Sequence, residues 1–502
     1  MAAGSGAGAQ AINPEAKRIL ALMVYSAVFL ELLLPGAKDP DIVWATMWAT
    51  LVPLWFGPLA LLVPSCRRRW YDPAVLFNGM MFYYTVKGVT LAFDTNIPYV
   101  AGMSYGAIHE AYLFSALTVI AGVLAWNLGF YLVLRRGPRV LKPAGPRISG
   151  SILSPWWRNP VFILTLAGTW CFLLFFQSTG QSILGFLVNP LLRSYLTDGT
   201  LGVQAPMANF WKLGAYLWPL GSLVWTAQIG WVGARRPSLM WLHIVTGAAI
   251  YFLIGGRIDT LGFLLGVLVL SNMLIQVTSR RVFAAAGAAG FIYAYLTDLW
   301  RELWGQATDS DFSSRVRALG GMQHSLKGLT DLLVGQSLSD IRLLVKITDV
   351  YGRERDFEHG ETLTRIVTQF VPRSLWPSKP MDLSVVVNSL FDWREGLAGT
   401  PPGFVGEMFM NFHLPGVALG CAILGACFAW LYQHWALSVR GPFDAVKYAL
   451  VAPLAAMLPS ATFANVVSGA GVPILALILL ERWFGAGGGK SVEANRSIPE
   501  IL

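Results

Sequence analysis

Charge is scarce in this chain. Only 13% of its 502 residues are charged and 55% are hydrophobic, whereas a soluble domain carries about 25% charged residues. A soluble protein is therefore excluded, and the composition predicts an all-α polytopic membrane protein. The formal net charge of +9 does not indicate a nucleic-acid partner, because most of the excess lies in short loops beside apolar runs, where anionic lipid headgroups attract it.

Cysteine and metal-binding patterns are also sparse. The six histidines show no HExxH-type spacing, and GAGGGK at 485–490, with Ser491, misses the phosphate-loop spacing because position 484 is Phe. Asp309-Ser310-Asp311 resembles a metal-binding DxD but directly precedes a predicted helix, where these residues are favoured caps. We therefore expect no metal and no cofactor. External disulfides are not expected either, since all four cysteines lie in or beside apolar runs: Cys66, Cys171, Cys421 and Cys427.

Long apolar runs are what the chain does have. A membrane-spanning helix needs about 20 residues, and runs near this length predict twelve spans at about 19–36, 43–63, 73–93, 109–134, 160–177, 210–232, 239–255, 258–277, 282–298, 413–437, 446–463 and 468–484. Clusters of Lys and Arg fall on alternate connections, so both termini are predicted to be cytoplasmic. The first run shows no cleavage site and is expected to remain as an anchor.

The predicted organisation follows from these runs. Nine spans occupy 1–298, a large external loop occupies 299–403, three spans occupy 404–484, and 485–502 forms a flexible cytoplasmic tail. The loop is charged but balanced, with twelve Lys/Arg against thirteen Asp/Glu. Helical spacing predicts one loop helix from Phe312 to Leu333. A second is predicted over Leu363, Ile366, Val367 and Phe370 and ended by Pro372.

Several external cations are candidates for binding a phosphate group. Arg257 lies in GGR at a tight external turn, where it either approaches a substrate, or pairs with Asp259 or extends to the lipid headgroups. VPRSLWPSKP, 371–380, holds Arg373 and Lys379 on either side of Trp376, and its three prolines stiffen the backbone. A preorganised Arg and Lys suit a diphosphate, although a proline-rich turn at headgroup depth is the alternative.

Further candidates differ in their alternatives. Arg193 either binds substrate or anchors an interfacial helix. Arg315 and Arg317 lie on the polar side of the first loop helix, where they either add to a phosphate-facing surface or form a solvated face. Glu407, in GFVGEMFMNFHLPGV at 403–417, is either an acid–base group or a structural anchor. His359 in FEHGET is either a base or a solvated histidine near a helix cap.

Four segments together carry a resemblance to a known family. DPAVLFNGMMFYY at 72–84, GGR at 255–257, the helix followed by VPRSLWPSKP at 361–380, and GEMFMNFHLPGV at 406–417 resemble the Wzy-type polymerases of bacterial oligosaccharide repeat units. The family often has Asn-Phe-Gly after its acid, whereas this chain has Asn411-Phe412-His413. The substitution of His for Gly affects either the local backbone or the sugar pocket.

The resemblance implies a metal-independent glycosyltransferase of GT-C-like architecture in the bacterial inner membrane. Such an enzyme transfers a growing glycan from polyprenyl diphosphate to the next lipid-linked repeat unit on the periplasmic face, in the synthesis of O-antigen, capsule or exopolysaccharide. Its partners would be the polyprenyl-diphosphate-linked oligosaccharide, membrane lipid, a chain-length regulator and a flippase. Carried over to this sequence, the family's functional residues correspond to Arg257, Arg373, Lys379 and Glu407, and Asn411 is a candidate for contact with substrate.

Two other functions are consistent with the same features. An O-antigen ligase would share the lipid-linked donor but use lipid A-core as its acceptor. A flippase or secondary transporter would also have about twelve spans, but transporters usually carry intramembrane charges in two similar halves. This chain instead concentrates its charge in one external loop.

Overall fold

The protein is all-helical over the residues that its computed structural model describes. These are residues 14–62, 69–94, 100, 102–136, 159–180, 182–183, 185, 207–232, 238–255, 257–275, 290, 292–293, 340–368, 371, 375–376, 383–391 and 401–486. Within them there is no sheet, and the one β-bridge joins Tyr351 to Arg355. The all-α class predicted from composition is therefore confirmed.

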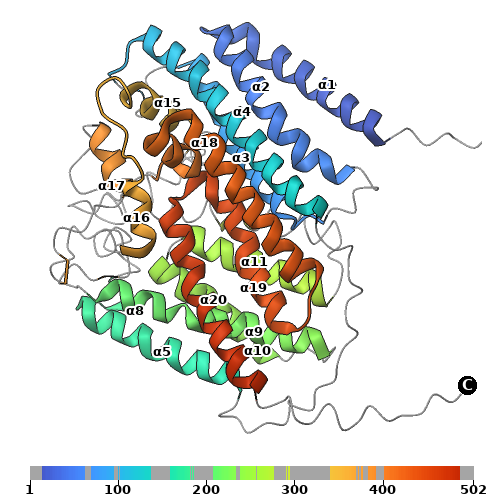
Figure 1. The fold of residues 1–502 in the computed structure, drawn as a ribbon, viewed down its shortest axis with the longest axis vertical. Coiled ribbons are helices and arrows are strands. Elements are labelled where there is room, and N and C mark those ends of the chain that lie inside the picture. Colours follow the sequence, from blue (N-terminus) through green and yellow to red (C-terminus); the bar gives the residue numbers. More distant parts are fainter. Residues whose placement is uncertain are drawn as a thin grey trace, which may run out of the picture.

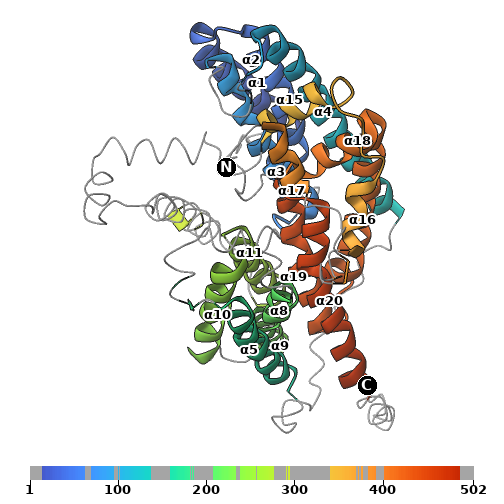
Figure 2. The same ribbon diagram turned by 90° about the vertical axis from the view of Figure 1, so that its left-hand side faces the viewer.

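The long helices form two packed groups (Figures 1 and 2). The first group surrounds one hydrophobic core and the second surrounds another. Two C-terminal helices, α19 (Pro442–Met457) and α20 (Phe463–Ala486), contribute side chains to both cores and join the groups. The first group contains α1 (Pro14–Leu33), α2 (Pro40–Phe56), α3 (Pro73–Val86), α4 (Tyr105–Arg136), α15 (Ile341–Val350) and α18 (Gly403–Tyr432). The second contains α5 (Pro160–Thr179), α8 (Ala208–Ala215), α9 (Leu217–Val232), α10 (Ser238–Ile250) and α11 (Arg257–Leu274).

Short elements connect these helices. Two α-helices, α16 (Glu361–Thr368) and α17 (Leu383–Asn388), belong to the long loop before α18. The 3₁₀ turns are η1 (Leu34–Gly36), η2 (Pro58–Leu62), η4 (Lys87–Ala92), η9 (Ser389–Phe391) and η11 (Leu458–Ser460). The π-helical turns are η8 (Tyr251–Gly255) and η10 (Gln433–Leu437).

Local sequence explains where several helices begin. Asp39, Asp72 and Asn159 each precede a proline, and each side chain accepts hydrogen bonds from backbone amides of the helix that follows. An Asp or Asn cap satisfies amides that lack an intrahelical partner, and proline fits the first helical position. These dipeptides therefore fix the first turns of α2, α3 and α5.

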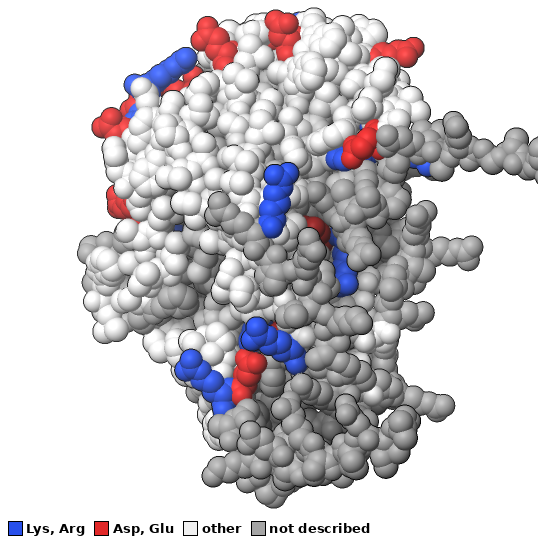
Figure 3. Space-filling model, turned by 45° about the vertical axis from the view of Figure 1, so that its right-hand side comes forward, with Lys and Arg blue, Asp and Glu red and all other residues white. Residues whose placement is uncertain are grey.

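Six helices in the described part are long and apolar enough to cross a membrane. They are Glu15–Gly36, Pro40–Ala60, Tyr105–Arg135, Pro160–Thr179, Gly403–Leu437 and Phe463–Trp483, each of which overlaps one of the runs picked out from sequence. Two shorter apolar helices, Ser238–Ile254 and Asp259–Leu274, overlap two more runs. The run at 282–298 lies largely outside the described residues. The chain is thus a multi-pass membrane protein, and Figure 3 shows that charged side chains are few and scattered over the described surface of one face.

Polar side chains inside the first group pair with one another. Asn78 of α3 and Asn127 of α4 are buried and exchange two amide hydrogen bonds, each of 3.0 Å. The hydroxyls of Ser115 and Thr348 lie 2.9 Å apart and join α4 to α15. Such pairs satisfy polar groups that would otherwise be costly in an apolar interior.

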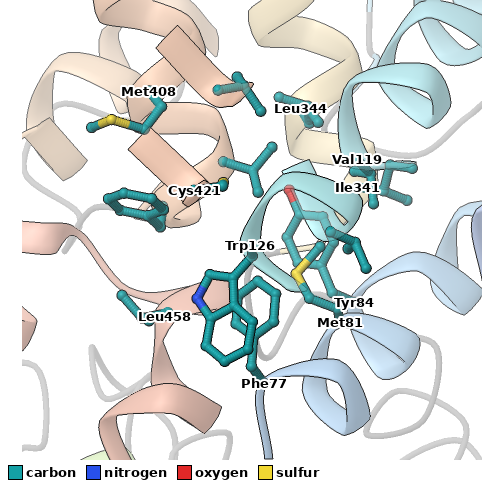
Figure 4. Close-up of a cluster of buried hydrophobic side chains, with 14 of the residues drawn as sticks. Phe77, Met81, Tyr84, Val119, Trp126, Ile341, Leu344, Met408, Cys421 and Leu458 are labelled. Carbon is teal, nitrogen blue, oxygen red and sulfur yellow. The ribbon is translucent and has the colours of Figure 1, made fainter. Parts of the chain in front are cut away.

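Helix α15 belongs to the long loop, yet it is packed within the membrane-helix group. Ile341 and Leu344 are completely buried, and Figure 4 shows both side chains in the same cluster as Val119 and Met408. Asp340 caps the helix and forms a buried ion pair with Arg342, so the charges at its start are neutralised within the protein. This stretch of the loop is therefore part of the core.

Helices α4 and α18 pack with their backbones in close contact. Gly129 of α4 faces the backbone of Ala422, and Gly425 of α18 faces the backbone of Trp126, so closely that a Cβ atom at either glycine would overlap a carbonyl oxygen. Small residues allow backbones to approach in this way in membrane proteins. The close approach fixes α18 against α4.

Candidate functional site

Helix α18 is broken where the loop re-enters the membrane domain. Phe412 (φ −141°) and His413 (φ 57°, ψ −158°) have non-helical dihedral angles. A Cβ atom on Gly420 would lie 2.6 Å from the Met408 sulfur, although twelve residues of straight helix would separate the two positions by about 18 Å. Residues 403–411 therefore fold back against residues 414–432.

The fold-back places Glu407 at a junction of three helices. Glu407 is only 1% exposed. Oε2 accepts a hydrogen bond of 2.6 Å from the backbone amide of Phe463, the first residue of α20, and Oε1 accepts one of 3.3 Å from the hydroxyl of Thr362 on α16. The Glu407 side chain therefore accepts a backbone amide at the N-terminus of α20, where such amides lack an intrahelical partner.

Asn411 lies one turn further along and completes the same network. Its Nδ2 donates to Thr362 Oγ1 at 2.6 Å and to the carbonyl of Glu407 at 2.7 Å, while its Oδ1 accepts from the amide of Gly360 at 2.8 Å. Asn411 is fully buried. Its side-chain amide therefore links α18 to the loop, and its predicted contact with substrate stays a prediction.

The loop in turn satisfies the broken end of the helix. The amide of Glu358 donates to the carbonyl of Met410 at 2.9 Å, and the amide of His359 donates to the carbonyl of Asn411 at 3.2 Å. Carbonyls at the end of a helix have no partner within it. The segment from Glu358 to Thr362 is therefore fixed to residues 403–411 by both backbone and side-chain hydrogen bonds.

His413 occupies a backbone conformation that glycine adopts far more readily. A φ of 57° with ψ of −158° is costly for any residue with a Cβ atom. The imidazole packs against three phenylalanine rings at centroid distances of 5.1–5.8 Å: Phe114, Phe357 and Phe409. A histidine at this position therefore raises the local backbone energy at the break and adds aromatic contacts.

No family model, curated protein or solved structure matches the chain.

Only some of the remaining candidate residues lie within the described part of the structure. Arg257 is the first residue of α11, with its side chain outside the described part, and Trp376 is 39% exposed in the loop. His359 is exposed, has φ 46°, and lies two residues before the start of α16, just ahead of the second loop helix as predicted. The structure brings together Glu407, Asn411 and the backbone of His359. The other predicted positions lie outside the described residues: Arg193, Arg315, Arg317, Arg373 and Lys379.

One group of described side chains has the composition of a metal site. Ligand atoms of Asp39, Asp41 and His109 all lie within 4.8 Å of one another. Asp39 Oδ1 already caps α2, and Asp39 Oδ2 lies 2.8 Å from His109 Nδ1. The group therefore links the first turn of α2 to the start of α4. Burial raises the pKa of Asp39, but hydrogen bonds from His109, Tyr105 and the amide of Ile42 outweigh that effect and hold the pKa below its ordinary value.

Thr362 is the residue that sequence reasoning missed. It contributes both a donor to Glu407 and an acceptor to Asn411, and it is 8% exposed. Thr362 is the last residue of FEHGET, three positions after His359, and this pattern gave no sign of a partner 45 positions away. A threonine on the buried face of the predicted second loop helix was the only signal available.

Proposed function

We propose that the protein is a Wzy-type polymerase of lipid-linked oligosaccharide repeat units. One observation carries the proposal. The loop helix α16, the re-entry segment 403–411 and the start of α20 all meet at the buried carboxylate of Glu407. The helix and the re-entry segment are two of the four segments that resemble the polymerase family. Their hydrogen-bonded association in the described structure supports treating them as one site.

The proposed reaction is a glycosyl transfer outside the membrane. The bond between the anomeric carbon and the donor diphosphate breaks, and its electron pair stays on the phosphate oxygen. The acceptor hydroxyl forms the new bond to that carbon and loses its proton to a base. Guanidinium groups placed beside the diphosphate stabilise the developing charge, which is the role proposed for Arg257 and Arg373, with Lys379 as a further cation.

The geometry favours the anchoring role for Glu407 over the acid–base role. Its carboxylate is buried and accepts hydrogen bonds from Thr362 and from Phe463. His359 is exposed and adjoins the same network. We therefore assign Glu407 to positioning the loop helix and His359 to accepting the proton of the acceptor hydroxyl.

The finer architecture belongs to this proposal as well. A polymerase of the GT-C-like type would have twelve spans with both termini in the cytoplasm, and it would bind polyprenyl diphosphate at the periplasmic face of the bacterial inner membrane. The six long apolar helices and two shorter ones described here are compatible with that topology.

The decisive experiment supplies purified protein with a lipid-linked repeat unit and looks for a polymer ladder. Arg257→Gln and Arg373→Gln should each lower the rate by about 10²–10³, the usual effect of removing one donor that stabilises a transition-state anion. Arg353→Gln is the matched control, since Arg353 is 59% exposed and pairs with Asp349 and Glu110.

Three results would contradict the proposal in different ways. Intact substrate with no ladder from the wild-type protein would exclude polymerase activity. Transfer to lipid A-core without polymerisation would identify a ligase. Unchanged polymer from folded Arg257 and Arg373 variants would exclude the arginine mechanism while leaving the activity in place.

A further inference from the structure

A groove on the outside of the first helix group has a regular apolar wall. The groove has a volume of about 460 Å³ and lies along α4 beside Phe56 of α2. Leu124, Leu128 and Leu132 line it at four-residue intervals and are 45%, 59% and 47% exposed. Asn127 also borders the groove, but its amide is bonded to Asn78. The wall along the groove is therefore mainly hydrocarbon.

A cationic side chain lies at one end of the groove. Arg135, in the last turn of α4, is an exposed lining residue. The same end of the helices carries Arg18, whose guanidinium lies 3.8 Å from the centre of the Trp55 ring, next to Phe56. A second groove of about 660 Å³ on α1 repeats the pattern, with Lys17 at one end and mainly apolar side chains along the rest.

The length of the groove matches one leaflet of a bilayer. Leu124 and Arg135 are eleven positions apart, which is about 16 Å of α-helix, and one leaflet accounts for about half of the ~30 Å hydrocarbon core. An apolar side chain every turn suits an acyl chain running along the helix. A guanidinium at the end of that path suits a phosphate, which it binds by charge-assisted hydrogen bonds.

We propose that this groove is a binding site for one anionic glycerophospholipid, with an acyl chain along Leu124, Leu128 and Leu132 and the headgroup phosphate beside Arg135. A zwitterionic phospholipid offers the same chains, but its own ammonium group competes with the guanidinium for the phosphate. The site therefore selects for net negative charge. The proposal stands independently of the glycosyltransferase activity.

Native mass spectrometry of the full chain in detergent tests the proposal. Phosphatidylglycerol and phosphatidylcholine with identical acyl chains are added separately, and the fraction of protein retaining lipid is measured. The wild-type protein should retain phosphatidylglycerol at about tenfold lower lipid concentration, because one charge-assisted contact changes affinity by roughly that factor. Arg135→Gln should remove the difference, and Arg135→Lys should keep part of it.

Matched substitutions separate the groove from the rest of the surface. Leu128→Trp should fill the groove and lower retention of both lipids, whereas Leu166→Trp, at a 60% exposed leucine of α5, should not. Arg440→Gln removes an exposed cation elsewhere and should leave the preference intact. Equal retention of the two lipids by the wild type, an unchanged preference in Arg135→Gln, or equal effects of the two Trp variants would each overturn the proposal.

Discussion

The network around Glu407 makes a quantitative prediction about stability. Hydrogen bonds to a charged group contribute about 1.5–3 kcal/mol and neutral ones about 0.5–1.5 kcal/mol. The carboxylate accepts hydrogen bonds from the Thr362 hydroxyl and from the Phe463 amide. Glu407→Gln removes the charge that both donors meet, so it should lower the free energy of unfolding by about 2–4 kcal/mol.

A pair of substitutions on α16 supplies the matched control. Thr362→Val keeps the side-chain shape but removes the donor to Glu407 and the acceptor for Asn411, which should cost about 1–3 kcal/mol. Thr364→Val, two residues along the same helix, removes an exposed hydroxyl bonded only to the carbonyl of Glu361 among the contacts of the described structure. It should change the free energy of unfolding by less than about 0.5 kcal/mol.

The assay is denaturant unfolding in detergent micelles, followed by tryptophan fluorescence, together with hydrogen exchange of the α16 amides. Thr362→Val should speed exchange in α16 and Thr364→Val should not. The double variant of Glu407 and Thr362 should lose less stability than the two single losses added together, because both remove the same hydrogen bond. Additive losses of stability, or exchange rates in α16 that are unchanged by Thr362→Val, would refute the idea that this network holds the loop helix.

Three further predictions rest on other features. His413→Gly should be more stable to heat than His413→Ala by about 1 kcal/mol or more, because both lose the ring but only Gly relieves the positive φ; equal melting temperatures would contradict the strain. Gly425→Ala should destabilise the protein by about 1–3 kcal/mol through overlap with the α4 backbone, whereas Gly106→Ala, which meets open space, should unfold like the wild type. Folding lowers the pKa of Asp39, so the ionised carboxylate stabilises the folded state at pH values above its unfolded pKa of about 3.9. This contribution is lost as the pH falls from there through the lower pKa of the folded state. Melting temperatures of the wild type and Asp39→Asn should therefore converge below about pH 4, and a constant gap would exclude the linkage.

The sequence predicted the parts of the fold that depend on local pattern. Apolar runs near 20 residues located the six long helices, since length and composition alone decide whether a helix can cross a bilayer. Spacing of Leu363, Ile366 and Val367 predicted α16. The run expected to start at 413 coincides with the break in α18, where the second part of that helix begins.

Long-range features could not be predicted in this way. α15 was not among the loop helices predicted from the sequence, although it follows an Asp cap and has apolar residues at helical spacing, and its burial among α4 and α18 was not predicted either. The contact between Thr362 and Glu407 depends on the fold-back of residues 403–411, which brings together segments that have no periodic relation. The apolar run at 210–232 was predicted to form one span, but it is divided at Tyr216 into two shorter helices, α8 and α9.

The close contact between α4 and α18 has a consequence for biosynthesis. The two helices lie about 300 positions apart in the chain, and synthesis proceeds at about 5–20 residues per second. On these figures α4 emerges roughly 15–60 seconds before its partner. During that interval the glycine surface that α18 will cover stays open to lipid or to an insertion factor. The first helix group therefore reaches its final packing only after the long loop and the re-entry segment have been made, so a ribosome stalled in that loop would leave an unfinished membrane domain for quality control to remove.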